Sequence, residues 1–363
     1  MKIRFFSNIP SPYRIDFFNM LGKKVDLEVI FEAEKAPIIN NKWYSENAIK
    51  SFKAVFLKKG TIEEKKVNFR ILQYVNKTPD LLIFTNYSYY TEMIGLICAK
   101  IRRLKYALMI DGGMISKKES SFKKLMKTFL ISGADLYFSP SRSSDDFLLY
   151  YGAEMEKIKR YPFTSLKKEE VLKEIVSIEE KEEIKKEFKV EEEKVILSIG
   201  QFIPRKGFDW MIKAYKDMNK NIGIYIIGGI PPKEYIDLKK QYNMSNLHFI
   251  DFQNKKNILK WYKIANVFVL PTREDIWGLV VNEAMGQGVP VITTDKCVAG
   301  LELIENSING YIVNVEDKSN LLKKTNYILS IDTEEIAINN LNVMSQYTLE
   351  NMVSVTYEIL MNR

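Results

Sequence analysis

The sequence predicts an α/β protein with two doubly wound domains, each built on a parallel sheet. Its 363 residues exceed the roughly 100–200 residues of one typical domain. In both halves, short apolar runs bounded by turns alternate with segments of helical periodicity, which is typical of parallel strands joined by helices. A stretch rich in charges of both signs, residues 161–194, separates the two series.

The first series predicts a complete α/β unit. Strands are expected at 2–8, 26–33, 80–86, 106–111 and 134–141, and helices at 14–24, 91–104 and 121–133. Residues 161–168 are interpreted as a linker, followed by an exposed helix. We therefore place the N-terminal domain at 1–165.

The second series repeats the alternation. Strands are expected at 194–200, 222–229, 247–252, 266–272 and 289–294, and helices at 207–218, 232–242, 256–265 and 278–288. The C-terminal domain is placed at 166–345. Residues 346–363 are predicted to form a helix that packs back on the N-terminal domain.

The amino-acid composition limits the kind of protein that this chain can be. Hydrophobic residues make up 46% and charged residues 28%, as in ordinary soluble globular proteins. Cys98 and Cys297 lie in different halves, which favours two buried thiols in a reducing compartment. No apolar stretch approaches the roughly 18 residues of a membrane span, and the first residues resemble no signal peptide. We expect a cytoplasmic protein, either soluble or peripheral on the inner face of the cell membrane.

The net charge of +8 is unevenly distributed. Residues 1–165 contain 28 Lys and Arg against 17 Asp and Glu, a net charge of +11. Residues 166–363 contain 26 against 29, a net charge of −3. The basic half favours an anionic partner, for which nucleic acid, an anionic membrane surface and a phosphorylated acceptor are candidates. A general lysine bias of the sequence is the alternative explanation.

One helix in the basic half carries an apolar stripe edged by lysines. The stripe consists of Phe122, Leu125, Met126, Phe129 and Leu130, and the flanking cations are Lys117, Lys118, Lys123, Lys124 and Lys127. Such a helix can lie in an anionic bilayer surface. The same spacing is also typical of a helix packed on a core. The charge surplus favours the first reading, so residues 117–131 are predicted to contact an anionic membrane surface.

The segment 271–288, PTREDIWGLVVNEAMGQG, begins where a predicted strand ends. Ligands of open α/β sheets bind at the carboxyl ends of the strands. Gly278, Leu279 and Val280 open the following helix, and the first amides of a helix have no intrahelical acceptor. These amides therefore favour an anion such as a phosphate.

Glu283 lies about one and a half turns further along the same helix, among apolar residues. A carboxylate in such surroundings is costly unless it is hydrogen-bonded, and sugar hydroxyls beside the phosphates could supply the hydrogen bonds. Amides for phosphate and a carboxylate for a hydroxyl pair together indicate a nucleotide. The alternative makes Glu274 and Asp275 helix caps and Glu283 a solvated residue, which suits only Glu274.

A second strand-to-helix turn also indicates a nucleotide. In ILSIGQFIPRKGF, Gly200 ends a strand, and Arg205 and Lys206 precede the glycine that opens a helix. Two cations there suit a diphosphate, whereas a surface loop with solvated charges is the alternative. A further glycine turn, IIGGIPP, follows the next strand. The sequence has no G-x-G-x-x-G fingerprint, no G-x-x-x-x-G-K-[ST] loop, no D-x-D pair and no Cys/His cluster.

These residues resemble a known family. The order G-Q-x(3)-R-K-G, then V-x-P-[ST]-x-E-D-x-W-G-L-V-x-x-E-A-x-x-x-G-x-P-V-I, is similar to the retaining glycosyltransferases of family 4. These enzymes use nucleotide sugars and have the GT-B architecture, two Rossmann-like domains facing a cleft. The resemblance is strong over 194–315 and weaker over 1–165, where SNIPSPYRIDFFNML, LMIDGG and ADLYFSPSRSSDDFLLYYGAEMEKI are similar to loops of the family.

The resemblance implies transfer of a sugar from a nucleoside diphosphate sugar, with UDP favoured, to a hydroxyl of a saccharide or lipid-linked saccharide in cell-surface polysaccharide synthesis. The implied catalytic residues are Asp111, Arg205, Lys206 and Asp275. The implied donor-binding residues are Gln201, Arg205, Lys206, Gly228, Phe252, Glu274, Asp275, Gly278, Leu279, Val280 and Glu283. No cofactor, metal ion or nucleic-acid partner is expected.

Three positions depart from the family pattern. The family has two glutamates separated by seven residues, and counting back from Glu283 reaches Asp275, with Glu274 one step earlier, so either acid could face the sugar. Gln201 stands where the family usually has arginine, which shifts diphosphate binding to Arg205 and Lys206. Asp111 stands near a position where many relatives have histidine. Two rival functions are a glycoside hydrolase, which leaves the Arg-Lys turn unexplained, and a catalytically inactive sugar-nucleotide-binding partner subunit.

Overall fold

The computed structural model describes residues 1–36, 49–63, 66–116 and 119–363. The chain divides into two compact units. Unit 1 comprises Met1–Phe163 and Leu349–Arg363, and unit 2 comprises Thr164–Thr348. The sequence places the corresponding boundaries at 165 and 345. None of the helices in the described ranges is long and apolar enough to cross a membrane.

The described part of unit 1 contains a seven-stranded, fully parallel sheet with the order β3-β2-β1-β4-β5-β6-β7. Its strands are β1 (Lys2–Ser7), β2 (Asp26–Phe31), β3 (Lys53–Phe56), β4 (Leu81–Phe84), β5 (Tyr106–Met109), β6 (Leu136–Ser139) and β7 (Ile158–Arg160). Its α-helices are α1 (Pro12–Leu21), α2 (Tyr90–Ile101), α3 (Ser121–Ile131), α4 (Arg142–Tyr150) and α13 (Leu349–Met361). The order reverses between β1 and β4, which makes this pair the topological switch point of the sheet.

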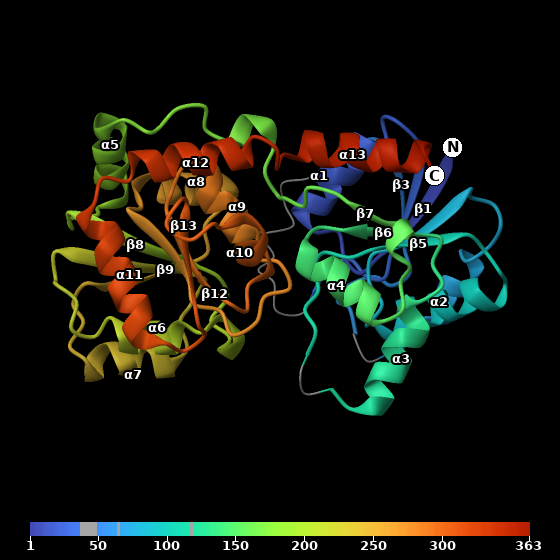
Figure 1. The fold of residues 1–363 in the computed structure, drawn as a ribbon, viewed down its shortest axis with the longest axis horizontal. Helices are drawn as coiled ribbons and strands as arrows, with labels where there is room; N and C mark the ends of the chain where they lie inside the picture. The colour runs from blue at the N-terminus through green and yellow to red at the C-terminus, as the bar shows by residue number, and fades with distance from the viewer. Residues whose placement is uncertain (37–48, 64–65, 117–118) are drawn as a thin grey trace. The chain divides into compact units, whose positions relative to one another are not determined.

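The helices of unit 1 cover both faces of its sheet. In Figure 1, α1 and α13 lie together on one side, and α2 and α3 lie on the other. Lys24, just after α1, places its ammonium group over the ring of Tyr357 on α13, with the nitrogen 5.0 Å from the ring centroid. The C-terminal helix therefore belongs to unit 1, although the chain passes through unit 2 before reaching it.

The described part of unit 2 contains a six-stranded, fully parallel sheet with the order β10-β9-β8-β11-β12-β13. Its strands are β8 (Lys194–Ile199), β9 (Ile222–Ile227), β10 (Leu247–Ile250), β11 (Val267–Leu270), β12 (Val291–Thr294) and β13 (Gly310–Val313). Its α-helices are α5 (Ile178–Phe188), α6 (Phe208–Ala214), α7 (Lys233–Gln241), α8 (Lys255–Ile264), α9 (Leu279–Gly286), α10 (Val298–Leu303), α11 (Lys318–Ser330) and α12 (Glu334–Met344).

Unit 2 is also doubly wound. Helices α6, α7 and α11 pack on one face of the sheet, and α5, α8, α9 and α12 lie on the other (Figure 1). All residues of β11 and β12 are buried, as expected for strands covered on both faces. The order reverses between β8 and β11, the two strands whose following turns carry the predicted site.

Several elements differ from the prediction. The helix expected at 207–218 ends at Ala214, and that expected at 278–288 spans only Leu279–Gly286. Strands β3, β7 and β13 were not expected; β3 and β7 have no fully buried residue and therefore give no apolar run. Cys297 is buried as expected, but Cys98 is only half-buried.

Candidate functional site

The candidate site of unit 2 lies at the switch point of its sheet. β8 and β11 are hydrogen-bonded neighbours, so the turns that follow them start at the same edge. After β8, the short 3-10 helix η5 (Pro204–Lys206) leads through Gly207 into α6. After β11, residues 271–278 lead into α9. The two motifs singled out from the sequence therefore meet in the fold, at the place where open α/β sheets bind ligands.

The two turns touch so closely that one position admits only glycine. Gly207 has a φ of 72°, and a Cβ atom there would lie 2.0 Å from the carbonyl oxygen of Pro271. The same carbonyl accepts a hydrogen bond of 2.8 Å from Trp210 Nε1. Thr272 Oγ1 donates to the carbonyl of Arg205 over 2.9 Å. The backbones of the two turns are therefore in direct contact.

The contact brings the predicted cations against one predicted acid. Lys206 Nζ donates to Asp275 Oδ2 over 2.5 Å, and Arg205 Nη1 lies 3.9 Å from the same oxygen. The side chains of Lys206 and Asp275 are only 11% and 10% exposed, whereas that of Arg205 is 48% exposed. A lysine–carboxylate pair sheltered in this way is screened much less than a surface pair.

The structure separates the two adjacent acids. Asp275 is buried, and its amide donates to the carbonyl of Lys296 over 2.9 Å. Glu274 is exposed, and its carbonyl oxygen accepts hydrogen bonds from Arg205 Nη1 and Thr272 Oγ1. Of the two carboxylates, that of Asp275 lies beside the cations.

The start of α9 is held rigidly. Gly278 has a φ of 103°, and a Cβ atom there would lie 2.8 Å from Cys297 Sγ, so packing as well as backbone conformation requires glycine. The indole of the buried Trp277 donates to Asn282 Oδ1 over 2.8 Å. Leu279 and Val280 form the first turn of the helix, where amides have no earlier helical carbonyl to bond. These amides follow Asp275, the acid that pairs with Lys206, by four and five residues.

Glu283 occupies a separate polar pocket of the same unit. Its Oε1 accepts a hydrogen bond of 2.9 Å from Ser165 Oγ, and its Oε2 accepts one of 3.2 Å from the Tyr262 hydroxyl. Burial raises the pKa of the Glu283 carboxyl, and the nearby Lys255 ammonium opposes this increase. Lys255 is itself anchored to Glu170 Oε2 at 2.6 Å. Glu283 is therefore an oriented carboxyl group and not a solvated residue.

The remaining donor-binding candidates lie on the same edge of the sheet. Gln201 follows β8 and is half-buried, and Phe252, also half-buried, follows β10. Gly228 follows β9, and a Cβ atom there would lie 1.9 Å from the carbonyl oxygen of Gly200. The candidates thus come from the carboxyl ends of four neighbouring strands, β10, β9, β8 and β11.

Asp111 belongs to unit 1, two residues after β5. Its carboxylate forms a salt bridge with the Arg14 guanidinium and accepts a hydrogen bond of 3.0 Å from the Tyr13 hydroxyl. Burial alone would lower the pKa of Arg14, but the Asp111 carboxylate, together with Tyr13 and Tyr161, outweighs burial and raises it. Burial, reinforced by Asp111, raises the pKa of Tyr13. Asp111 is a fixed anion whose charge is balanced by a buried arginine.

Sequence reasoning missed most of the partners of these acids. Arg14 and Tyr13 on α1, Ser165 in the predicted linker, and Tyr262 on α8 were not singled out. Arg14 could have been noticed, because it is a cation inside the otherwise apolar face of a short helix. Ser165 and Tyr262 gave no local signal, since both reach Glu283 only through the tertiary fold.

Within the described ranges, no group of three or more His, Cys, Asp or Glu side chains is arranged to hold a metal ion. The single histidine, His248, lies within the strand expected at 247–252. It lies on β10 with a 34% exposed side chain, and its Nε2 is 2.5 Å from Glu192 Oε1. Its partner is therefore an acid at the other end of the sheet, away from the switch-point turns.

The two Rossmann-like units, with cations and helix amides at the switch point of one of them, define a protein with the GT-B fold of glycosyltransferases. A crystal structure of Anabaena Alr3699/HepE in complex with UDP superimposes on the chain with a TM-score of 0.78, at 16% identity and over 100% of both chains. Residues 179–347 match the family model of glycosyl transferases group 1, and this part of the chain belongs to that family. The resemblance seen in the sequence is confirmed at this level, whereas membership of family 4 stays a prediction.

Curated relatives are similar over part of the chain. An uncharacterized glycosyltransferase of Methanocaldococcus jannaschii is 29% identical over 177 residues, which are 47% of this chain and 45% of the relative. The lipopolysaccharide glucosyltransferase WaaG of Escherichia coli is 27% identical over 112 residues, which are 30% of this chain and 29% of that enzyme. The chain thus matches less than half the length of either relative.

Proposed function

We propose that the chain is a retaining glycosyltransferase that moves a sugar from a nucleoside diphosphate sugar, with UDP as the favoured nucleotide, to a hydroxyl of a saccharide or lipid-linked saccharide. The observation that carries the proposal is the meeting of Arg205, Lys206 and Asp275 beside the first turn of α9. Solved complexes of HepE, which contain UDP, UDP with glucose, and UDP-glucose, support the choice of nucleotide.

The chemistry follows from charge. When the glycosidic bond to the diphosphate breaks, negative charge develops on the leaving oxygen. Lys206, Arg205 and the amides of Leu279 and Val280 are fixed donors that would stabilise this charge in the transition state. Because protein cations and amides serve the leaving group, the proposed reaction needs no metal ion.

The acids take different roles in this proposal. Asp275, beside Lys206, would accept hydrogen bonds from the sugar hydroxyls, and Glu283 would accept them from the ribose. Asp111 would act as an electrostatic partner of the transition state, with Arg14 holding its orientation. In the resting site, Lys206 is bound to Asp275, so an incoming diphosphate would compete with that carboxylate for the ammonium group.

A panel of nucleotide sugars tests the proposal. Thermal stabilisation by one donor, followed by mass detection of a glycosylated acceptor, would establish transfer and the sugar. Nuclear magnetic resonance of the anomeric proton would show whether configuration is retained. An inactive partner subunit would bind the donor without releasing nucleotide, and a glycoside hydrolase would cleave a saccharide without needing any donor.

Glu283→Ala should weaken binding of free UDP by about 100-fold or more, because two hydrogen bonds to a charged group contribute roughly 1.5–3 kcal/mol each and every 1.4 kcal/mol is about tenfold. Isothermal titration of UDP measures the effect. Ser165→Ala is the matched control, since it removes one partner of Glu283 and keeps the carboxyl group. UDP affinity unchanged in Glu283→Ala would contradict the ribose role.

Excess EDTA should leave the transfer rate unchanged, because Arg205, Lys206 and the α9 amides supply the positive charge that a divalent ion would otherwise provide. Initial rates with and without EDTA check this expectation. A loss of activity that Mg²⁺ or Mn²⁺ restores would show that the diphosphate is bound through a metal ion.

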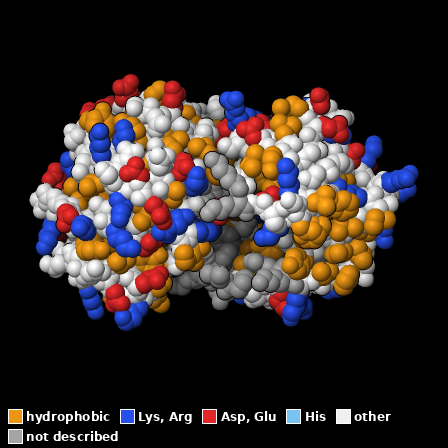
Figure 2. Space-filling model, turned by 60° about the horizontal axis from the view of Figure 1, so that its bottom comes forward, with side chains coloured by type: hydrophobic (Ala, Val, Ile, Leu, Met, Phe, Trp, Pro, Cys, Tyr) orange, Lys and Arg blue, Asp and Glu red, His pale blue; other side chains and the backbone are white. Residues whose placement is uncertain are grey.

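We also propose that α3 of unit 1 contacts an anionic membrane surface. The helix exposes the apolar stripe seen in its sequence, with Phe122 72%, Leu125 67% and Phe129 48% exposed, and it buries only Leu130 and Ile131. Three of the five stripe residues are thus exposed, which supports a membrane contact over packing on the core of unit 1, where Leu130 lies. Figure 2 shows hydrophobic side chains gathered on this face of unit 1.

Lysines border this apolar surface. Lys123 and Lys124 are exposed, whereas Lys127 is paired with Glu119 Oε1 at 2.6 Å. Lys117 and Lys118, which the sequence-based prediction included, lie outside the described residues. The combination of exposed aromatic and aliphatic side chains with neighbouring cations supports a lipid surface bearing negative charge.

Replacing Lys117, Lys118, Lys123, Lys124 and Lys127 with Gln should release the protein from anionic liposomes, at about 1 kcal/mol per lysine near the surface. Liposome sedimentation at low and high salt measures this, and UDP binding should not change. The matched control replaces five exposed lysines of unit 2, Lys173, Lys186, Lys220, Lys240 and Lys318, with Gln. A wild type that ignores anionic liposomes at low salt would refute the membrane proposal.

A further inference from the structure

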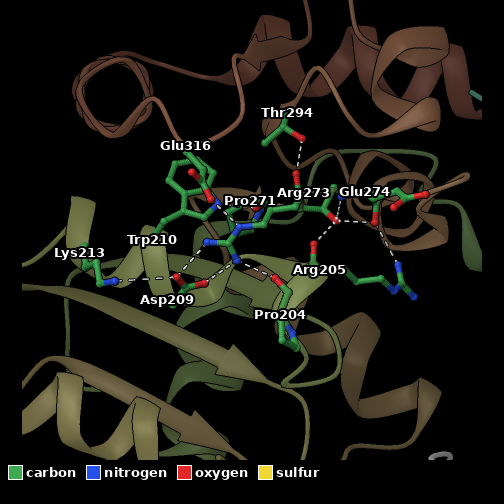
Figure 3. A network of polar contacts seen from close by, with 11 residues as sticks. Pro204, Arg205, Asp209, Trp210, Lys213, Pro271, Arg273, Glu274, Thr294 and Glu316 are labelled. Carbon is green, nitrogen blue, oxygen red and sulfur yellow. Dashed lines mark hydrogen bonds and ion pairs between the residues drawn. The ribbon is translucent and has the colours of Figure 1, made fainter. Parts of the chain in front are cut away.

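Arg273, which lies between Thr272 and Glu274 in the turn after β11, is the centre of a polar network. The sequence motif treats this position as variable, and nothing in the local sequence distinguishes it. In the structure, its guanidinium donates to three groups from three segments of unit 2. Figure 3 shows these contacts together with the turn that carries Arg205.

The hydrogen bonds of Arg273 are short and use all three nitrogens of its guanidinium group. Nη1 donates to the carbonyl oxygen of Pro204 over 2.7 Å and to Asp209 Oδ1 over 2.8 Å. Nη2 donates to Asp209 Oδ2 over 2.9 Å, which completes a bidentate pair. Nε donates to Glu316 Oε1 over 2.6 Å. One side chain thus joins η5, the first turn of α6 and the segment after β13.

The backbone of the same residue makes a further contact with η5. The amide of Arg273 donates to the carbonyl of Arg205 over 2.6 Å. Arg273 therefore binds the carbonyls of the two residues that precede Lys206. The turn has few hydrogen bonds of its own, namely those from the amides of Lys206 and Gly207 to Ile203 and Pro204. Arg273 thus supplies two of the hydrogen bonds that tie this turn to the β11 turn, beside those donated by Thr272 Oγ1 and Arg205 Nη1.

We propose that Arg273 is a positioning residue that sets the separation between the cations of η5 and the turn that carries Asp275, and so aims Arg205 and Lys206 at a bound diphosphate. This inference rests on the proposed function and names the residue that organises the same site. Displacing catalytic groups by about 1 Å can cost roughly 100-fold in rate, so a single anchor of the cation turn has a measurable effect.

The test compares ligands that differ only in phosphate. Affinities of UDP, UMP and uridine are measured by titration calorimetry for the wild type and Arg273→Met; if another base is preferred in the donor panel, its diphosphate, monophosphate and nucleoside replace them. We expect UDP affinity to fall at least tenfold and uridine affinity to stay within about twofold, because only the phosphates meet the displaced cations. Arg273→Lys should not restore UDP affinity, since one ammonium group cannot form the bidentate pair with Asp209.

Lys213→Met is the matched control. Lys213 is the other cation beside Asp209, at 4.0 Å from Oδ2, and the structure gives it no contact with η5. The Lys213→Met variant should bind UDP with the affinity of the wild type. If Arg273→Met fails to fold, Asp209→Asn weakens the same anchor and should show the same phosphate-selective loss in smaller measure.

Each result separates the inference from the proposed function. Equal loss of UDP and uridine in Arg273→Met, or UDP binding unchanged, would overturn the positioning role while leaving the glycosyltransferase proposal intact. A wild type that binds no nucleoside diphosphate and no nucleotide sugar would instead overturn the proposed function. Phosphate-selective loss in Arg273→Met with normal binding in Lys213→Met would establish the role.

Discussion

Lys206→Ala should lower turnover by about 10²–10³-fold, because it removes a preaimed donor from the departing diphosphate. The effect should appear in kcat as well as in kcat/KM, since the charge that Lys206 stabilises is larger in the transition state than in the bound donor. Steady-state rates with the donor identified by the panel measure it. The sequence alone suggests a loop cation with little influence on folding.

The structure adds a cost in stability to this prediction. Lys206→Ala leaves the buried Asp275 carboxylate with only Arg205 Nη1 at 3.9 Å, so the variant should also melt at a lower temperature. Lys263→Ala is the control for ion-pair loss in the same unit, because it breaks a 2.6 Å pair with Glu180. Near-normal turnover of Lys206→Ala would exclude Lys206 from the reaction.

Asp275→Asn should lower the transfer rate and raise the affinity for free UDP. Transfer should fall by roughly 100-fold, because the amide replaces the carboxylate that we assign to the sugar hydroxyls. Free UDP should bind several-fold more tightly, because the diphosphate no longer competes with a carboxylate for Lys206 and no longer faces its negative charge. A loss of folding would lower both the transfer rate and the UDP affinity. A lower rate with a higher affinity would therefore show that the diphosphate and Asp275 compete for Lys206.

The same experiment decides between the adjacent acids. Glu274→Gln changes an exposed carboxylate. Arg205 is hydrogen-bonded to the backbone carbonyl of Glu274 and not to its side chain. The effect of Glu274→Gln on transfer should be small beside that of Asp275→Asn. The reverse result, with transfer lost in Glu274→Gln and kept in Asp275→Asn, would assign the sugar-facing role to Glu274.

The candidate residues could be selected from the sequence because they follow the ends of strands. A buried parallel strand is an apolar run, and the turn after it is adjacent in sequence, so Gly200–Lys206 and Pro271–Glu283 could be recognised locally. Edge strands were harder to predict. β3 and β7 have only four and three residues with no fully buried position, and so give no apolar run.

Choosing between Asp275 and Glu274 was beyond the sequence. The two acids are adjacent, and a motif that counts residues accommodates either. The tertiary structure distinguishes them because a one-residue step turns the side chain toward Lys206, 69 residues away, or toward solvent. The importance of Arg273 was likewise invisible, since its acceptors lie 64 and 43 positions distant for Asp209 and Glu316.

Local patterns in the sequence were enough to predict two parallel α/β units with cations and acids after their strands, because apolar runs, glycine turns and helix starts can each be recognised within a few residues. The folded chain was needed to show that β8 and β11 are neighbours, that Lys206 pairs with Asp275, and that Ser165 reaches Glu283 across 118 residues. Strand order sets these contacts, and it depends on how the elements pack together, which no local pattern encodes.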